Sequence, residues 1–170
     1  MGLPIQKIVS DPILGLIDIG NVLPMIDTKQ FQSLAYKYQL GLAFLLFPSA
    51  THTSKQHCLG AYQRTKNLTR RWMEAGMVTK DQANTASAFA LYHDIGHGPF
   101  SHTVEPLFDL MPGGKKSAFR ADDAMGLEIV KSLKKEIEET GVDFDGLIKL
   151  FEHKDPLYLA VHDKNLGMEK

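Results

Sequence analysis

Histidines and carboxylates are concentrated in one stretch of this sequence. Five of its seven histidines lie between residues 52 and 102, and Asp94 and Glu105 lie among or just beyond them. Neutral imidazole and carboxylate groups are suitable ligands for Zn, Mn, Fe, Co or Ni, and mixed nitrogen and oxygen ligands with open positions are typical of hydrolytic centres. This stretch therefore predicts a divalent transition metal that activates water. The five histidines are His52, His57, His93, His97 and His102.

The segment from His93 to His102 reads His-Asp-Ile-Gly-His-Gly-Pro-Phe-Ser-His. It resembles, residue for residue, the central motif of the HD-domain metal-dependent phosphohydrolases, in the dNTP triphosphohydrolase group that includes the sterile-alpha-motif and HD-domain enzyme. Shorter pieces of the sequence follow the order of that family's N-terminal half. They are Asp11-Pro12, Phe31-Gln32, Gln39-Leu40-Gly41, Pro48, Thr51-His52-Thr53 and His57-Cys58-Leu59-Gly60.

By this resemblance, His57, His93 and Asp94 take the positions of three metal ligands. Consecutive residues of a helix point about 100° apart. His93 and Asp94 can therefore reach one ion only at a helix end, beside a second helix that supplies His57. The resemblance also allows a second, phosphate-bridging ion such as Mg.

The resemblance also implies catalytic residues. His97 and His102 match histidines that lie over the substrate phosphates, where an imidazolium neutralises charge or donates a proton to the leaving oxygen. Glu105 matches an acidic residue that orients such a histidine. Members of the family commonly carry an arginine on substrate phosphate where this sequence has Ser54. Either the neighbouring Lys55 binds substrate in its place, without the two-pronged geometry of arginine, or phosphate binding is weakened.

The fourth metal ligand of the family is an Asp that directly precedes a Lys. Glu169 with Lys170 best fits that position by spacing, so Glu169 is the expected ligand and Lys170 a substrate contact. Asp163, followed by Lys164, is the alternative. In either alignment the chain resembles the family's N-terminal portion and ends inside its last ligand motif, so we expect residues 1–170 to be a single HD domain, C-terminally truncated relative to the family.

Apolar periodicity and capping residues predict the elements that position these side chains. Turn residues among apolar ones over residues 5–22 favour a small hairpin. Helical spacing and capping signals predict a mostly helical remainder. The first expected helix starts at Asp27 or Thr28 and runs through Phe31, Leu34 and Tyr38. A second covers residues 54–75, with Leu59, Tyr62, Leu68 and Trp72 inward, and a third opens at the Thr79/Gln82 capping box and runs to His93. Further helices are expected over residues 122–140, with Met125, Ile129, Leu133 and Ile137 inward, over residues 145–153, and from Asp155-Pro156. The fold class is all-α, an HD-domain helical bundle with a small N-terminal β-hairpin.

Composition limits the partners and the cellular compartment that we expect for this domain. Nineteen basic and twenty acidic residues leave a net charge of −1, which gives no strong nucleic-acid signal. The single cysteine, Cys58, excludes an intrachain disulfide and fits a reducing compartment. The longest apolar run, residues 40–47, is far shorter than the roughly 20 residues of a membrane helix. We therefore expect a cytoplasmic protein with no membrane partner.

These features together predict a metal-dependent phosphohydrolase of nucleotides, and the resemblance implies that it converts a dNTP to deoxynucleoside and triphosphate. An HD phosphohydrolase acting on a nucleoside monophosphate or a phosphodiester is one alternative, favoured by Ser54. The other is a truncated, non-catalytic HD module that binds nucleotide or a partner chain. Related enzymes form dimers and tetramers, so the resemblance also allows a homo-oligomer.

Overall fold

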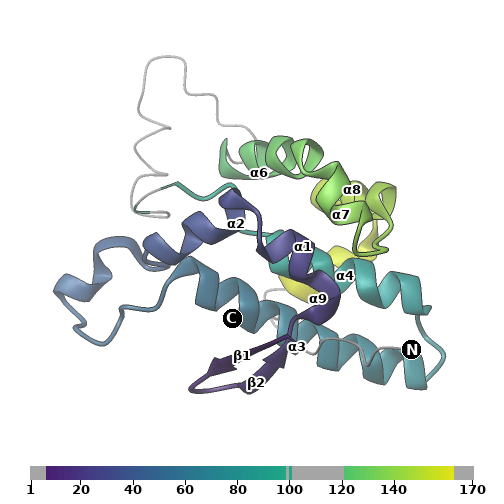
Figure 1. The fold of residues 1–170 in the computed structure, drawn as a ribbon, viewed down its shortest axis with the longest axis horizontal. Coiled ribbons are helices and arrows are strands. Elements are labelled where there is room, and N and C mark those ends of the chain that lie inside the picture. The colour runs from purple at the N-terminus through teal and green to yellow at the C-terminus, as the bar shows by residue number, and fades with distance from the viewer. Residues whose placement is uncertain (1–6, 99, 101–120, 163–170) are drawn as a thin grey trace.

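A computed structural model describes residues 7–98, 100 and 121–162. Over these residues the chain is mostly helical, with an antiparallel two-stranded hairpin at its start (Figure 1). The predicted all-α bundle with an N-terminal β-hairpin is confirmed. The elements are β1 (Ile8–Asp11), β2 (Gly15–Asp18), the 3-10 turn η1 (Gly20–Val22), α1 (Leu23–Ile26), α2 (Lys29–Ser33), η2 (Leu34–Tyr36), η3 (Gly41–Leu45), α3 (Ser54–Glu74), α4 (Lys80–Tyr92), α6 (Ala121–Ser132), α7 (Lys134–Glu138), α8 (Phe144–Phe151), η5 (Pro156–Tyr158) and α9 (Leu159–His162).

The hairpin is closed by a side chain. The Asp11 Oδ1 atom accepts the backbone N–H groups of Ile13 and Leu14, each at 2.8 Å. Gly15 then takes a φ of +76°, a conformation that costs glycine little. The resulting register pairs Val9 with Ile17, whose side chain is fully buried and ties the hairpin to the core.

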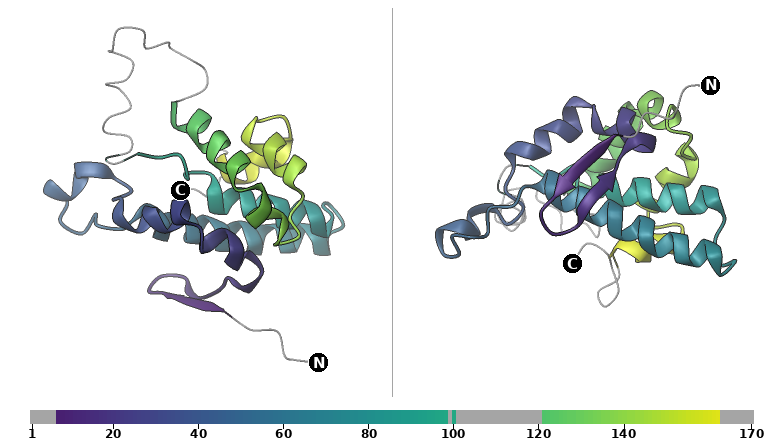
Figure 2. Two further views of the ribbon diagram at one scale, coloured as in Figure 1. Left: turned by 45° about the horizontal axis from the view of Figure 1, so that its top comes forward. Right: turned by 60° about the horizontal axis from the view of Figure 1, so that its bottom comes forward.

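Helices α3 and α4 form an antiparallel pair joined by a short loop at residues 75–79. They lie side by side in both views of Figure 2. Each begins with a capping box, Thr53 with Gln56 and Thr79 with Gln82, in which the threonine oxygen accepts the glutamine N–H and the glutamine oxygen accepts the threonine N–H. Because the pair is antiparallel, the start of α3 lies beside the end of α4.

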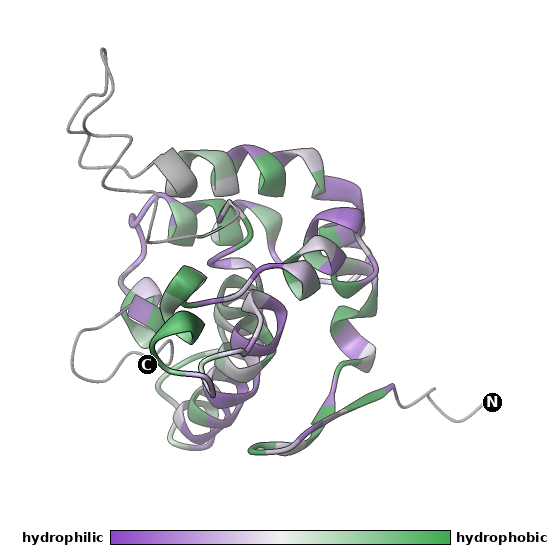
Figure 3. Cartoon of the chain, turned by 90° about the vertical axis from the view of Figure 1, so that its left-hand side faces the viewer, coloured by the Kyte–Doolittle hydropathy of each residue, from purple (hydrophilic) through white to green (hydrophobic). Residues whose placement is uncertain are grey.

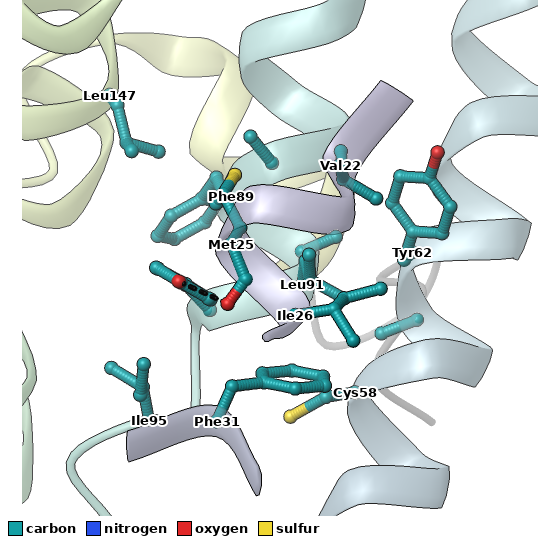
Figure 4. Packing of buried hydrophobic residues seen from close by; sticks show 14 of the residues in the cluster. Val22, Met25, Ile26, Phe31, Cys58, Tyr62, Phe89, Leu91, Ile95 and Leu147 are labelled. Carbon is teal, nitrogen blue, oxygen red and sulfur yellow. Dashed lines mark hydrogen bonds between the residues drawn. The ribbon is translucent and has the colours of Figure 1, made fainter. Parts of the chain in front are cut away.

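Helix α4 is the centre of the core, since nearly all of its residues from Ala83 to Tyr92 are buried. Side chains from α1, α2, α3 and α8 point toward it and one another (Figure 4). Phe89 meets Phe151 of α8 edge to face with ring centroids 5.0 Å apart. Helices α6, α7 and α8 lie together above α4 in Figure 1. The core therefore fixes the end of α4 from several sides.

Several sequence predictions are wrong in detail. The helix capped by Thr28 ends at Ser33 and continues only as η2, because Tyr38 pairs with Thr53 in an isolated antiparallel bridge. The inward face of α3 carries smaller residues than expected, whereas the predicted Leu68 and Trp72 are only partly buried. The buried residues of α3 are Ser54, Cys58, Leu59, Ala61, Tyr62, Thr65 and Thr69.

The predicted helix over residues 122–140 is divided into α6 and α7 at Leu133. That residue takes φ −101° and ψ 21°, and its N–H bonds to the carbonyls of both Ile129 and Val130 at 3.1 Å. The interruption is thus a tightened turn, which apolar periodicity does not reveal. Met125, predicted inward, is 57% exposed.

The apolar run at residues 40–47 projects from the body of the fold. Leu45, Leu46 and Phe47 are largely exposed, and this end of the molecule, at the left of Figure 1, is strongly hydrophobic where Figure 3 turns it toward the viewer. Within the described part of the chain, no helix combines the length and apolar character needed to cross a bilayer.

Candidate metal centre

The antiparallel α3/α4 pair brings three predicted ligands together. His57 lies in the first turn of α3, where its N–H bonds to the carbonyl of Thr53 at 3.1 Å. His93 is the C-terminal cap of α4, and Asp94 follows it in the turn that leaves the helix. His93 and Asp94 thus face His57, which lies 36 positions before His93 in the sequence.

The ligand atoms of these residues converge on one point. The His57 Nε2 atom lies 3.1 Å from His93 Nε2 and 3.3 Å from Asp94 Oδ2. The third side of the triangle, His93 Nε2 to Asp94 Oδ2, is 3.4 Å. All three atoms fall within 4.8 Å of one another, and among the described residues they form a group able to hold a metal ion.

The hydrogen bonding of His93 sets which nitrogen can bind a cation. Its Nδ1 atom lies 2.8 Å from the Ala90 carbonyl oxygen. Because a carbonyl oxygen can only accept, Nδ1 carries a proton and donates. When the ring is neutral, Nε2 therefore holds the lone pair, which is directed at His57 and Asp94. The same arrangement, with the distal ring nitrogen tied to a carbonyl, is common for metal-binding histidines.

The spacing of the three atoms fits a first-row divalent metal. Imidazole nitrogen and carboxylate oxygen bind Zn²⁺ at about 2.1 Å, so neighbouring ligands at angles between 90° and tetrahedral are roughly 3.0 to 3.4 Å apart. The observed separations of 3.1, 3.3 and 3.4 Å fall within that span. Facing lone pairs at these distances repel one another unless a cation, a proton or a metal, lies between them. The donor set therefore fits the predicted transition metal.

Two further side chains hold the Asp94 carboxylate. The His97 Nε2 atom donates to Oδ1 at 2.9 Å, and the Gln39 Nε2 atom donates to Oδ2 at 2.9 Å. Burial raises the pKa of Asp94, but the doubly protonated, positively charged rings of His93 and His97 outweigh burial through their charges and hydrogen bonds and hold that pKa well below its usual value. Asp94 is therefore an anion in this site.

Gln39 reaches the site from an extended segment that runs beside the start of α3. The Gln39 N–H donates to the His52 carbonyl at 3.0 Å, and the Ser54 N–H donates to the Lys37 carbonyl at 2.9 Å. Side chains alternate along an extended chain. Lys37 and Gln39 accordingly approach the residues around Asp94, and the Lys37 ammonium donates to the His97 carbonyl at 2.6 Å. Tyr38, between them, is 45% exposed.

Aromatic rings surround His93 on the side of the C-terminal helices. The His162 ring of α9 lies 5.7 Å from the His93 ring and 5.3 Å from Phe89, centroid to centroid. His153 stacks on Tyr158 at 4.6 Å and lies 6.0 Å from His162. The isolated positions of His153 and His162 in the chain gave no sign that His162 packs near a candidate ligand and that His153 packs near His162.

Cys58 is adjacent to His57 in sequence but is fully buried. Burial, together with the negative charge of Asp94, raises the pKa of its thiol well above the usual value. A thiol held protonated is a poor nucleophile. Cys58 is therefore a core residue of this site.

The other predicted site residues are distributed differently. His97 lies at the centre through its bond to Asp94, whereas the Lys55 ammonium is directed to Gln32 Oε1, at 2.7 Å. The remaining predicted residues lie outside the described part of the chain, so their roles stay predictions. They are His102, Glu105, Asp163, Glu169 and Lys170. Gln39 was part of the quoted family pattern, but no role had been predicted for it.

The fold and this site define a class of protein, and comparison with known proteins identifies it. The HD domain family matches residues 55–164, so the chain belongs to the HD domain family. It is 30% identical over 184 aligned residues to the putative HD domain-containing protein L394 of Acanthamoeba polyphaga mimivirus, an alignment covering 96% of this chain and 40% of that protein. It is also 39% identical to the deoxynucleoside triphosphate triphosphohydrolase SAMHD1 of Danio rerio, over 61% of this chain and 17% of that protein.

Among solved structures, the crystal structure of a phosphohydrolase from Bacteroides thetaiotaomicron superimposes with a TM-score of 0.76 at 27% identity, covering 96% of this chain and 39% of that one. The chain thus spans well under half of the length of each of these proteins. The part of the chain that matches the HD domain family, residues 55–164, contains all three of the residues whose ligand atoms converge, His57, His93 and Asp94.

Proposed function

We propose that this chain carries the metal site of a phosphohydrolase that acts on nucleotides, and that its substrate is a dNTP, cleaved to deoxynucleoside and triphosphate. The observation that supports this most strongly is the convergence of His57 Nε2, His93 Nε2 and Asp94 Oδ2 within 3.4 Å of one another. A nucleotide substrate is also consistent with the name of the SAMHD1 relatives, which are deoxynucleoside triphosphate triphosphohydrolases.

His57, His93 and Asp94 would hold the ion. When bound, such an ion polarises a phosphoryl oxygen and lowers the pKa of water toward neutrality. His93 presents its Nε2 lone pair because its Nδ1 proton is committed to the Ala90 carbonyl, at 2.8 Å. Its ring is fully buried, which excludes water from that side of the centre.

His97 keeps the Asp94 carboxylate in place through the Nε2 proton and adds a titratable ring beside it. In the proposed reaction this ring neutralises phosphate charge when it is protonated, while His102, oriented by Glu105, donates a proton to the leaving oxygen. Lys37 contributes a second cation near His97, because its ammonium lies 2.6 Å from the His97 carbonyl oxygen.

For the fourth ligand we propose Glu169, which directly precedes Lys170 in the sequence, with Asp163 as the alternative. A direct comparison of the metal affinity of Asp163→Ala and Glu169→Ala separates the two assignments, since only the ligand's removal weakens binding strongly.

A different phosphoester is the second candidate, and Ser54 favours it. Its hydroxyl is fully buried without a hydrogen-bond partner among the described residues, so it cannot replace a phosphate-binding arginine. The deciding experiment incubates the protein and Mn²⁺ with dNTPs, nucleoside monophosphates and phosphodiesters, and identifies products by phosphorus NMR. Triphosphate from dNTPs supports the proposal, whereas phosphate from monophosphates alone supports the second candidate. Binding of nucleotide without turnover would indicate a non-catalytic module.

A further inference from the structure

Gln39 contacts the metal-site carboxylate from outside the α3/α4 pair. We propose that Gln39 is a positioning residue for the metal centre, whose amide fixes Asp94 so that a lone pair of Oδ2 faces the ion. The inference rests on the proposed metal site, and it adds a residue with which that site is built. It requires no contact between Gln39 and substrate.

The contact is buried and charge-assisted. Gln39 Nε2 lies 2.9 Å from Asp94 Oδ2, and the two residues are 6% and 9% exposed. A carboxylate can only accept, so the amide nitrogen must face it, which settles the orientation of the amide group. Hydrogen bonds to charged groups are about twice as strong as neutral ones.

Asp94 is held at both oxygens by different side chains. His97 occupies Oδ1 and Gln39 occupies Oδ2, each at 2.9 Å. A carboxylate fixed at one oxygen can still turn about its Cβ–Cγ bond, whereas one fixed at both cannot. Each carboxylate oxygen accepts about two hydrogen bonds. With Gln39 on one lone pair of Oδ2, the other would be available to an ion held together with His57 and His93.

The backbone of Gln39 is itself fixed relative to α3. Its N–H donates to the His52 carbonyl at 3.0 Å, and the preceding Tyr38 pairs with Thr53, the cap of α3. Gly41 closes the other side by donating to the Tyr38 carbonyl at 3.1 Å. The segment that carries the amide is therefore anchored to the helix that carries His57.

The other end of the Gln39 amide carries a cost that the bond to Asp94 must offset. Its Oε1 atom is buried and has no hydrogen-bond partner among the described residues. An unsatisfied buried acceptor costs about 1–3 kcal/mol. A glutamine that served only to fill space would be improved by an apolar side chain of the same size, so the bond to Asp94 is what offsets this cost.

The test compares Gln39→Met, which keeps the size but removes the donor, with Gln39→Asn, which keeps the amide but shortens its reach. Binding of Mn²⁺ and Co²⁺ is measured by calorimetry, and the Co²⁺ absorption spectrum reports ligand geometry. Removal of an orienting residue typically weakens metal binding about 10–100-fold. We expect a loss of that size in both variants, with a changed Co²⁺ spectrum.

Gln32→Met is the matched control, because this half-buried glutamine donates to the Ile26 carbonyl at 2.9 Å and not to Asp94. It should bind metal like the wild type. Wild-type affinity and spectrum in a folded Gln39→Met or Gln39→Asn protein would overturn the inference. Asp94→Ala separates this failure from failure of the metal site: if Asp94→Ala also binds normally, the site itself is wrong, whereas loss in Asp94→Ala alone refutes only the role of Gln39.

Discussion

Tyr92→Phe tests how the end of α4 is anchored next to the metal centre. Tyr92 is fully buried immediately before His93, and its hydroxyl donates to the Met25 carbonyl at 2.7 Å. The same hydroxyl lies 3.4 Å from Thr28 Oγ1. The ring packs on Phe31 with centroids 6.0 Å apart, a contact that phenylalanine would keep. The substitution therefore removes the hydrogen bond alone.

The expected loss follows from what remains at Met25. Its carbonyl also accepts a hydrogen bond from Thr28 Oγ1 at 2.8 Å, so it keeps one donor when the tyrosine hydroxyl is removed. The cost should then be that of one ordinary hydrogen bond, about 1 kcal/mol. For a domain of this size, that lowers the melting temperature by roughly 2–4 °C.

Urea unfolding of Tyr92→Phe measures this loss directly, with Tyr36→Phe as the control. Tyr36 is 92% exposed, and its change should alter the free energy of unfolding by less than about 0.5 kcal/mol. An unchanged stability of Tyr92→Phe would refute the anchoring role. A loss above about 3 kcal/mol would also contradict the reasoning, because it would mean that the Met25 carbonyl is left unsatisfied.

Two further predictions concern stability. Gly126→Ala should stabilise α6 by up to about 1 kcal/mol, because a Cβ there would meet the Gly96 backbone no closer than 3.6 Å. Gly146→Ala should not stabilise α8, because its Cβ would lie 2.5 Å from Oδ2 of the capping Asp143. Thermal unfolding of both variants checks this, and equal gains in melting temperature would contradict it. Since burial raises the pKa of Cys58, the unfolded thiol ionises above about pH 8.5 while the folded thiol stays protonated. The free energy of unfolding should therefore fall above that pH, and it should fall less in Cys58→Ala. Urea unfolding measures both proteins, and parallel pH profiles of the wild type and the variant would contradict this.

Local signals in the sequence were sufficient for most of the fold. The Thr79/Gln82 capping box correctly marked the start of α4, and turn residues correctly predicted the hairpin. The errors occurred where hydrogen bonds, and not apolar spacing, determine where a helix ends or is interrupted. Tyr38 leaves the helical pattern because it pairs with Thr53, and Leu133 interrupts a regular apolar repeat through a shared hydrogen bond. Neither contact has a signature at the level of spacing.

The candidate site was predictable to the extent that its residues lie in one motif. The adjacency of His93 and Asp94 at a helix end required a second helix with His57, and the structure places His57 there. The residues around this triad were not predictable in the same way. Gln39 reaches Asp94 across 55 positions of sequence, and Lys37 reaches His97 across 60. Such contacts follow from the path of an extended segment, which composition does not determine.

The central claim is that His57, His93 and Asp94 form a working metal centre. Its most direct test is the metal content of purified protein by mass spectrometry, together with triphosphate release from dNTPs in the presence of Mn²⁺ or Mg²⁺. We expect stoichiometric metal and triphosphate release in the wild type, and loss of both in the double variant His93→Ala with Asp94→Ala. A metal-free, inactive wild type, or release that persists in a folded double variant, would contradict it.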